Sequence, residues 1–358
     1  MTSTTTTSNS APVSGTDSLA AGSPSPATER AGPSRRKLLA AALGGMAVGS
    51  GLPAWAAQSG WPRHPVRVIV PYPAGGVNDV IARQFGERMA ATLGQSFVVE
   101  NRGGAGGTIG IAEMARSAGD GYTFAFGAIS PLTLNPHIMK VGYDPLRDIA
   151  PVASVMYAPV YVLATTAFKG NDFAAVLDAA KHHPKGVSVA TSGYGTLAHI
   201  MVEQLRRKSG ANLVHVPYKG GSQLITDAAG AQFDLLLANP YAPINALIAE
   251  GKLRVLAVTG PRRMPALAQI PTLGELGFTA ANLTSTFGFY APASTPADIQ
   301  QRFHAEVNRL LQSAEMQERL RKLDNMAYPM SQQAFAALVR QDYVANAKVI
   351  SEAGIQAQ

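Results

Sequence analysis

The sequence has 358 residues and no cysteine, which excludes disulfide bonds, thiolate catalysis and cysteine-ligated metal sites. With 46% hydrophobic and 15% charged residues, the composition is that of an ordinary globular protein, and the length favours two lobes over one. The formal net charge of +7 suits attraction of anions, although an incidentally basic surface explains it equally well. The basic residues form no long cluster interleaved with aromatic residues, so nucleic acid is not an expected partner.

The first 56 residues have the order of an export signal. A polar arm precedes Arg35 and Arg36, and an Ala- and Gly-rich apolar run follows from Leu38 to Leu52, which resembles a twin-arginine signal. The small residues around position 56 predict cleavage after Ala56. A retained membrane anchor is the alternative, but the run is shorter than the ~20 apolar residues that span a bilayer. We therefore expect residues 1–56 to be a twin-arginine-type signal peptide with a disordered N-terminal arm.

From Val66 onward, short β-branched runs alternate with helical patterns, which is typical of βαβ units and a mostly parallel sheet. Apolar residues recur every fourth position between Asn78 and Leu93, as an amphipathic helix requires, and Gly94 is expected to end that helix. The elements predicted in this half are strands at 66–70, 96–100 and 122–126 and helices at 78–93 and 108–116.

The same unit recurs further along the chain. Strands are predicted at 187–190, 213–216, 233–237 and 254–258, with helices at 197–208 and at the segment that ends at residue 229. Thr295 is expected to cap a helix whose first position is Pro296. The apolar residues predicted to form the buried face of that helix are Ile299, Phe303, Val307 and Leu310. A final helix is predicted from Gln332 to Ile350.

Three predicted strands each run into a glycine-rich turn that opens a helix. The turns are Tyr72–Asp79, Thr191–Thr196 and Pro217–Ser222. Glycine lets the backbone approach a ligand closely, while free N–H groups and the positive end of the helix dipole attract anions. Any α/β protein uses glycine in short turns, so it is the set of three, with polar residues beside them, that favours a ligand site.

Known motifs for cofactor binding, catalysis and metal binding do not match the residue spacing of this sequence. Gly104 and Gly106 resemble the start of a dinucleotide turn, but Ile109 stands where the third glycine is required. No phosphate-binding G-x-x-x-x-G-K-[ST] motif occurs, and Ser192 lacks the preceding glycine of a nucleophile elbow because Ala190 occupies that position. The seven histidines show no metal-ligand spacing. We therefore expect no catalytic residues, no metal and no cofactor.

Several side chains in the turns have two possible roles. His199 either hydrogen-bonds a ligand or braces its turn, and Lys219 either pairs with a carboxylate or is a surface lysine. Asp79 would repel an anion at contact, so it caps its helix or accepts a hydrogen bond from a ligand amine or hydroxyl. Tyr72 and Tyr218 form walls of the pocket or pack in the core.

The chain resembles a known family along almost its whole mature length. The segments that carry the resemblance are 68–76 with Asp79, 99–107, 120–123, 216–220, 251–259, Pro271-Thr272 with Glu275 and Gly277, and Ala291-Pro292 with Thr295-Pro296. They occur in the same order in the Bug, or TctC, proteins, which are the periplasmic solute receptors of tripartite tricarboxylate transporters. The sequence is therefore similar to a receptor family rather than to an enzyme.

The resemblance implies an α/β, type II periplasmic-binding-protein-like fold in which two α/β lobes surround a ligand cleft. The implied lobes are residues 57–164 plus 283–358 for the first and residues 165–282 for the second. It also implies a small carboxylate ligand and a two-subunit membrane permease as partner. The export signal predicts a periplasmic location, and a monomer is expected because a receptor that must dock and release has little need to oligomerise.

Carried over position by position, the resemblance and the turns together assign a set of ligand-binding residues. They are Tyr72, Ala74, Gly75, Gly76, Asp79, Ser130, Ser192, Gly193, Gly195, Thr196, His199, Tyr218, Lys219 and Asn239. The chain departs from the family pattern at residues 237–240, because many relatives have an acid about where Ala238 stands. The far end of the pocket is therefore expected to differ.

The leading hypothesis is an extracytoplasmic solute-binding protein that delivers a small carboxylate to a tripartite tricarboxylate-type transporter without catalysis. A receptor that signals to a membrane sensor uses the same closing lobes, so sequence does not separate the two. An enzyme on the same scaffold is the remaining alternative, but the sequence offers no identifiable nucleophile and base pair.

Overall fold

The computed structural model describes residues 60–353, so the predicted signal peptide at residues 1–56 lies outside the described residues. Side chains are described as far as Ser351.

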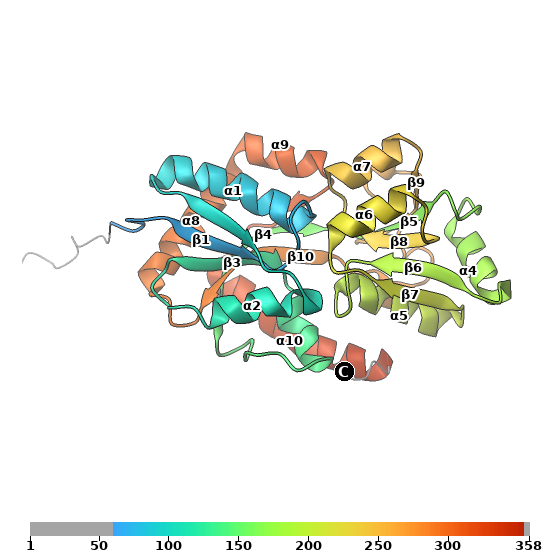
Figure 1. Cartoon of the computed structure of the whole chain (residues 1–358), viewed down its shortest axis with the longest axis horizontal. Coiled ribbons are helices and arrows are strands. Elements are labelled where there is room, and N and C mark those ends of the chain that lie inside the picture. Colours follow the sequence, from blue (N-terminus) through green and yellow to red (C-terminus); the bar gives the residue numbers. More distant parts are fainter. Residues whose placement is uncertain (1–59, 354–358) are drawn as a thin grey trace, which may run out of the picture. The chain divides into compact units, whose positions relative to one another are not determined.

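The first sheet has six strands in the order β11-β4-β10-β3-β1-β2 (Figure 1). Strand β1 is parallel to β2 and β3, whereas β10 is antiparallel to β3 and β4. The strands are β1 (Val66–Val70), β2 (Phe97–Asn101), β3 (Thr123–Ala128), β4 (Ile149–Ala158), β10 (Ser285–Pro292) and β11 (Met326–Ala327). The helices of this part are α1 (Val77–Leu93), α2 (Thr108–Ala115), α3 (Ser130–Thr133), α8 (Ala297–Gln312), α9 (Ala314–Lys322) and α10 (Gln332–Ala353), with short 3-10 turns at Ala105–Gly107 and Asn135–His137. We call this part lobe 1.

The second sheet has five strands in the order β7-β6-β8-β5-β9 and repeats the pattern of the first. Strand β6 is parallel to β7 and β8, and β5 is antiparallel to β8 and β9. The strands are β5 (Tyr161–Thr165), β6 (Val187–Thr191), β7 (Leu213–Pro217), β8 (Leu235–Ala238) and β9 (Leu253–Val258). The helices of this part, which we call lobe 2, are α4 (Phe173–His182), α5 (Leu197–Ser209), α6 (Gly221–Ala229) and α7 (Ala242–Ala249), and 3-10 turns lie at Pro265–Leu267 and Thr279–Ala281. The expected α/β fold with two lobes is confirmed.

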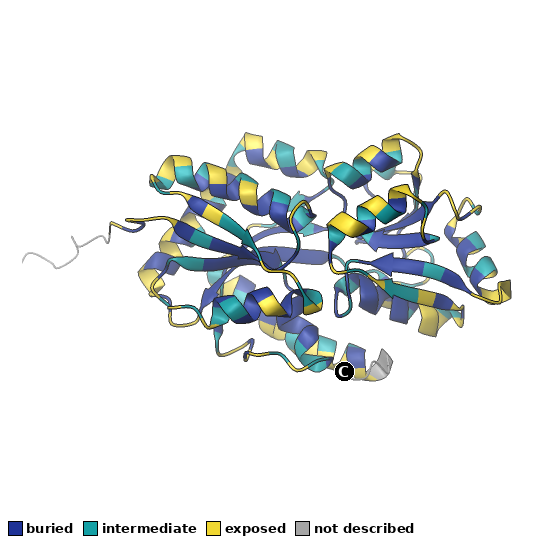
Figure 2. Cartoon of the chain, viewed as in Figure 1, coloured by how far each residue is buried: buried dark blue, intermediate teal, exposed yellow. Residues whose placement is uncertain are grey.

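Each lobe has its own apolar core between its sheet and its helices, so buried residues follow the strands and the inner helix faces (Figure 2). In α1, Ile81, Phe85 and Met89 are fully buried, as their spacing predicts, and Gly94 ends the helix in a left-handed conformation. In α8, the predicted apolar face is buried, and Phe303 stacks on Phe124 with 4.0 Å between ring centroids.

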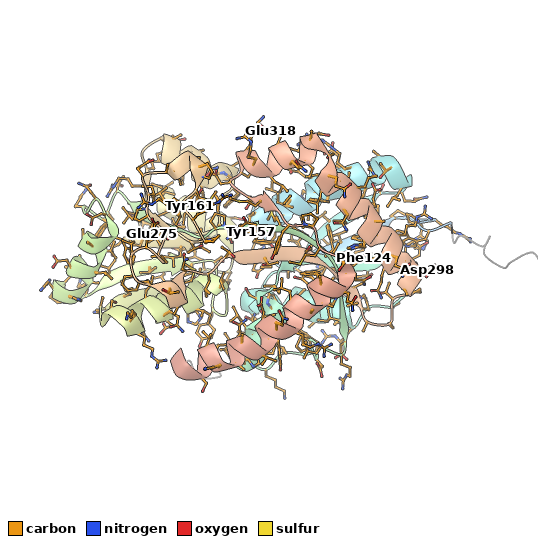
Figure 3. The ribbon with its side chains drawn as sticks, turned by 180° about the vertical axis from the view of Figure 1, so that it is seen from behind. Phe124, Tyr157, Tyr161, Glu275, Asp298 and Glu318 are labelled. Carbon is orange, nitrogen blue, oxygen red and sulfur yellow. The ribbon has the colours of Figure 1, made fainter. Side chains whose placement is uncertain are left out.

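The chain crosses between the lobes twice. Strand β4 of lobe 1 ends at Ala158 and strand β5 of lobe 2 begins at Tyr161, so Tyr157 and Tyr161 lie on either side of the first crossing (Figure 3). The boundary expected after residue 164 falls inside β5 (Tyr161–Thr165), and this strand pairs with lobe 2 along its length. The segment is continuously apolar and extended, so its pattern carries no sign of the change of sheet. The second crossing connects β9 to β10 and contains the other expected boundary, between residues 282 and 283.

The predicted cap of helix α8 is wrong. The helix begins at Ala297 with Pro296 as its N-cap residue, and the buried hydroxyl of Thr295 has no hydrogen-bond partner. Thr295 lies one position too early for its side chain to reach the free N–H groups of the first turn.

Candidate functional site

A cavity of about 70 Å³ lies between the lobes, beside the two crossings. Lobe 1 contributes the turn after β1, the end of β3 and the start of α3, whereas lobe 2 contributes the first turns of α5, α6 and α7. Val160 comes from the first crossing, and Phe287 comes from the beginning of β10, just after the second crossing. Six of the predicted residues line this cavity: Tyr72, Gly76, Ser130, Ser192, Thr196 and Asn239.

Three helix starts from the two lobes converge on the cavity. Residues at the beginning of α1, α5 and α6 line it, among them Gly76, Thr196 and Gly221. Neither Gly76, the N-cap of α1, nor Gly220, the N-cap of α6, supplies a side-chain cap. The first N–H groups of these helices therefore remain available, with the positive ends of two helix dipoles behind them. This arrangement attracts an anion.

Four polar side chains at the cavity make no hydrogen bond within the described residues. They belong to Asn78, Ser130, Ser192 and Tyr241, all of which line the cavity. Asn78 is only 8% exposed and its Oδ1 atom is buried without a partner. Burial raises the pKa of Tyr241 to about 12, so its phenol stays neutral and able to donate. Because buried polar groups are normally paired, these side chains indicate that a ligand completes the site.

Asp79 fixes the first turn instead of lining the cavity. Its carboxylate accepts hydrogen bonds of 2.9 Å from the Gly75 N–H and from Nε of Arg83. Burial opposes ionisation, but the hydrogen bonds from Arg83, Gly75 and Asn101 outweigh it and hold the pKa of Asp79 below its usual value. Asp79 therefore holds the turn that precedes α1, although its side chain makes no hydrogen bond that caps the helix.

Tyr72 lines the cavity, and its hydroxyl donates to the Gly106 carbonyl at 3.1 Å. Ala74 and Gly75 do not line the cavity, although the Ala74 carbonyl accepts a hydrogen bond from the Ser222 hydroxyl of the other lobe. This contact joins the first and third predicted turns across the cleft.

In the second turn, the cavity is lined by Ser192 and Thr196. The Thr196 hydroxyl donates to the Gly193 carbonyl at 2.8 Å and accepts from the His199 N–H, so it caps α5. Gly193 and Gly195 shape the turn outside the cavity, and Nδ1 of His199 accepts from the Gly195 N–H at 3.3 Å. The structure therefore places His199 as a brace of this turn.

His199 stacks on His215 beneath the turn, with 4.4 Å between the ring centroids. Burial and the charges of His215 and Arg206 lower the pKa of His199 to about 3, and burial together with Arg206 lowers that of His215 to about 4. Both rings are therefore neutral near neutral pH.

This histidine pair predicts a loss of stability on acidification. In the unfolded chain, histidines take up protons near pH 6.5, whereas the folded pair does so only near pH 4 and below, so the unfolded state binds more protons in between. We expect the free energy of unfolding to fall by about 1 kcal/mol per pH unit for each histidine below pH 6. Urea denaturation between pH 7 and 4.5 measures this slope. His215→Gln should flatten it by about half and the exposed control His183→Gln should not; equal slopes in all three proteins would contradict the prediction.

In the third turn, Tyr218 and Lys219 do not line the cavity. The Tyr218 hydroxyl donates to the Asp227 carboxylate at 2.7 Å. Lys219 is exposed and borders a second hollow, which shares Tyr72 and Ser192 with the cavity. Its charge lies where it can attract an approaching anion.

Asn239 lines the cavity, but its amide holds the crossings together. Nδ2 donates to the Pro159 carbonyl at 2.9 Å and to the Ser285 hydroxyl at 3.0 Å. Both of its N–H donors are thereby used within the protein.

The lobes touch closely around the cavity. A Cβ atom on Gly106 would lie 2.5 Å from the Tyr194 carbonyl oxygen, and one on Gly220 would lie 2.4 Å from Cδ of Pro73. A Cβ atom on Gly195 of lobe 2 would lie 2.6 Å from Oδ1 of Asn135 in lobe 1. Glycine at these positions therefore permits the lobes to close.

Several cavity residues were not predicted from the sequence, including Asn78, Ala128, Ile225, Tyr241 and Phe287. Asn78 and Gly221 lie within the predicted turns, and the helix starts could have singled them out. Phe287 and Val160 carry no such signal, because they read as ordinary strand and crossing residues.

Among residues 60–353, no helix is both long and apolar enough to cross a membrane. The same residues contain no group of three or more histidines and carboxylates that could hold a metal ion.

Comparison with known proteins places this geometry in one family. Residues 81–355 match the model of the tripartite tricarboxylate transporter family receptor, TctC. The chain is 32% identical to protein BugT of Bordetella pertussis over 277 residues, which cover 77% of this chain and 85% of BugT.

Two solved structures have the same fold. The periplasmic binding protein BugD is 31% identical with a TM-score of 0.79, and the match covers 83% of this chain and 100% of BugD. The R. palustris protein Rpa4515, solved with adipate, is 30% identical with a TM-score of 0.79 over 83% of this chain and 100% of its own. The periplasmic-binding-protein fold expected from the sequence is thus confirmed. This chain belongs to the TctC family of tripartite tricarboxylate transporter receptors, whose members are periplasmic solute-binding proteins.

Proposed function

We propose that this protein captures a small carboxylate between its lobes and delivers it to a two-subunit membrane permease of the tripartite tricarboxylate type. The observation that carries the proposal is the pair of uncapped helix starts, α1 and α6, which face one cavity from opposite lobes. A carboxylate accepts hydrogen bonds from such N–H groups and is stabilised by both dipoles.

The polar side chains at the cavity that have no hydrogen-bond partner also support a carboxylate ligand. Asn78, Ser130, Ser192 and Tyr241 can each donate a hydrogen bond to a carboxylate oxygen, directly or through water. The adipate in the structure of Rpa4515 is a small carboxylate. Among the cavity-lining residues, neither serine has a histidine or carboxylate within hydrogen-bond distance, so binding without turnover is the favoured activity.

Titration calorimetry tests the ligand class. The protein is refolded from denaturant to remove retained ligand and titrated with mono-, di- and tricarboxylates, and with the neutral amide of each acid as its matched control. We expect saturable binding of at least one acid and no binding of its amide. Absence of binding by every acid, or equal binding of acid and amide, would remove the carboxylate proposal.

Uptake measurements test the transport role. We propose that the protein is exported to the periplasm by the twin-arginine route. Because the permease would depend on the receptor for its substrate, we expect deletion of the gene to abolish uptake of the bound acid. If uptake persists and only a cellular response to the acid is lost, the protein is instead a receptor for a membrane sensor.

A further inference from the structure

The cavity combines one polar region with an extensive apolar wall. Val77, Leu224, Ile225, Ala238 and Ile244 all line it and belong to a single hydrophobic cluster around β8, α6 and α7. Val160 and Phe287 continue the apolar lining at the crossings.

No charged side chain lines this cavity among the described residues. Asp79 is engaged by Gly75 and Arg83, and Lys219 borders the neighbouring hollow instead. Both N–H donors of Asn239 are used by Pro159 and Ser285. The Tyr241 hydroxyl lies near the start of α6, because a Cβ atom on Gly221 would be 3.3 Å from it. Tyr241 also belongs to the apolar cluster, but its hydroxyl lies beside this helix start. The available donors thus accompany the helix starts, and Ile225, Ala238 and Ile244 offer no side-chain donor.

We propose that the ligand is a monocarboxylate with an apolar body, its single charge at the helix starts and its hydrocarbon against the wall formed by Ile225, Ala238 and Ile244. This inference rests on the proposed function. A second carboxylate on the ligand would be removed from water with no cation or free donor to receive it, and such a buried unpaired charge is strongly unfavourable. The apolar body, in contrast, gains from every buried methylene.

The cavity also limits the size of the ligand. Its volume of about 70 Å³ corresponds to roughly five to seven water positions, so short acids are the appropriate probes.

Matched pairs of acids test the inference by calorimetry on refolded, ligand-free protein. The pairs are butanoate with succinate, pentanoate with glutarate, and hexanoate with adipate, which differ only in the second carboxylate. We expect the best monocarboxylate to bind about 10- to 100-fold more tightly than its partner. If a dicarboxylate binds as tightly as its partner or more so, this inference is overturned while the proposed function stands. If neither series binds, the proposed function fails with it.

A charge placed in the wall provides a second test. Ala238→Lys introduces a cation beside the apolar cluster, and Ala238→Met is its neutral control of similar length. Relative to the methionine variant, the lysine variant should bind succinate at least about 10-fold more tightly. Its affinity for butanoate should rise only by the long-range attraction between the lysine and the approaching anion. Equal succinate affinities in two folded variants would show that the body of the ligand does not lie against this wall. If far-ultraviolet circular dichroism shows that Ala238→Lys is unfolded, the pair Ile225→Lys and Ile225→Met takes its place.

Discussion

Replacing Gly76 by aspartate is expected to abolish ligand binding and to leave the fold intact. Gly76 is the N-cap residue of α1 and lines the cavity, with φ at −82°, which any residue can adopt. A Cβ atom there would meet only the Pro73 carbonyl oxygen at 3.7 Å, an ordinary contact. The new carboxylate would accept hydrogen bonds from the N–H groups of α1 that we assign to the ligand. Two like charges about 4 Å apart at an effective dielectric constant near 20 repel by about 4 kcal/mol, which corresponds to about a 1000-fold loss of affinity.

The isosteric variant Gly76→Asn separates charge from shape. Asparagine also caps a helix, so it competes for the same N–H groups without repelling the ligand, and we expect a loss of only about 10-fold. Calorimetry gives the affinities, and the far-ultraviolet spectrum and free energy of unfolding check the fold. Retained affinity in Gly76→Asp, or equal losses in both variants, would place the ligand's charge elsewhere.

Replacing Gly106 by alanine is expected to prevent the lobes from closing. The added Cβ atom would lie 2.5 Å from the Tyr194 carbonyl oxygen of lobe 2, and a backbone atom cannot move aside as a flexible side chain can. Overpacking of this kind is typically unfavourable by 1–3 kcal/mol, so ligand affinity should fall about 10- to 100-fold. Small-angle X-ray scattering should show that added ligand no longer reduces the radius of gyration.

Gly210→Ala is the matched control for this substitution. Gly210 has φ at 65°, close to the 62° of Gly106, but a Cβ atom there has no neighbour within 4 Å. Both variants should lose about 1 kcal/mol of stability from the left-handed backbone, and only Gly106→Ala should lose affinity. If Gly210→Ala also binds the ligand more weakly, the loss of affinity in Gly106→Ala comes from backbone strain and not from blocked closure of the lobes.

Much of the architecture could be predicted from local patterns. The spacing of Ile81, Phe85 and Met89 identified the buried face of α1, and that of Phe303 identified the buried face of α8, because a helix buries every third or fourth residue. The strands of both sheets that precede glycine-rich turns were also found, with ends that differ by a few positions.

The strands at the crossings were not predicted individually. Strands β4, β5 and β10 are almost entirely buried, so they show no alternation that would reveal their partners or the change of sheet at residues 158–161. The cap of α8 was misplaced by one residue, although Thr295 followed by Pro296 matches the usual preference for threonine at the N-cap and proline at the first helical position.

By itself, the sequence determined the family, the two-lobed α/β fold and the glycine-rich helix starts. These features follow from local residue patterns, which can be recognised without knowing which distant residues are in contact. The tertiary structure alone decided which of those residues face the cavity. It turned His199 toward Gly195, Asp79 toward Arg83 and Asn239 toward the crossings, and it placed Ile225 and Ala238 in a wall that also includes Val77 of the other lobe. Such choices depend on which side chains two folded lobes bring together, and that information lies in long-range packing rather than in any single segment.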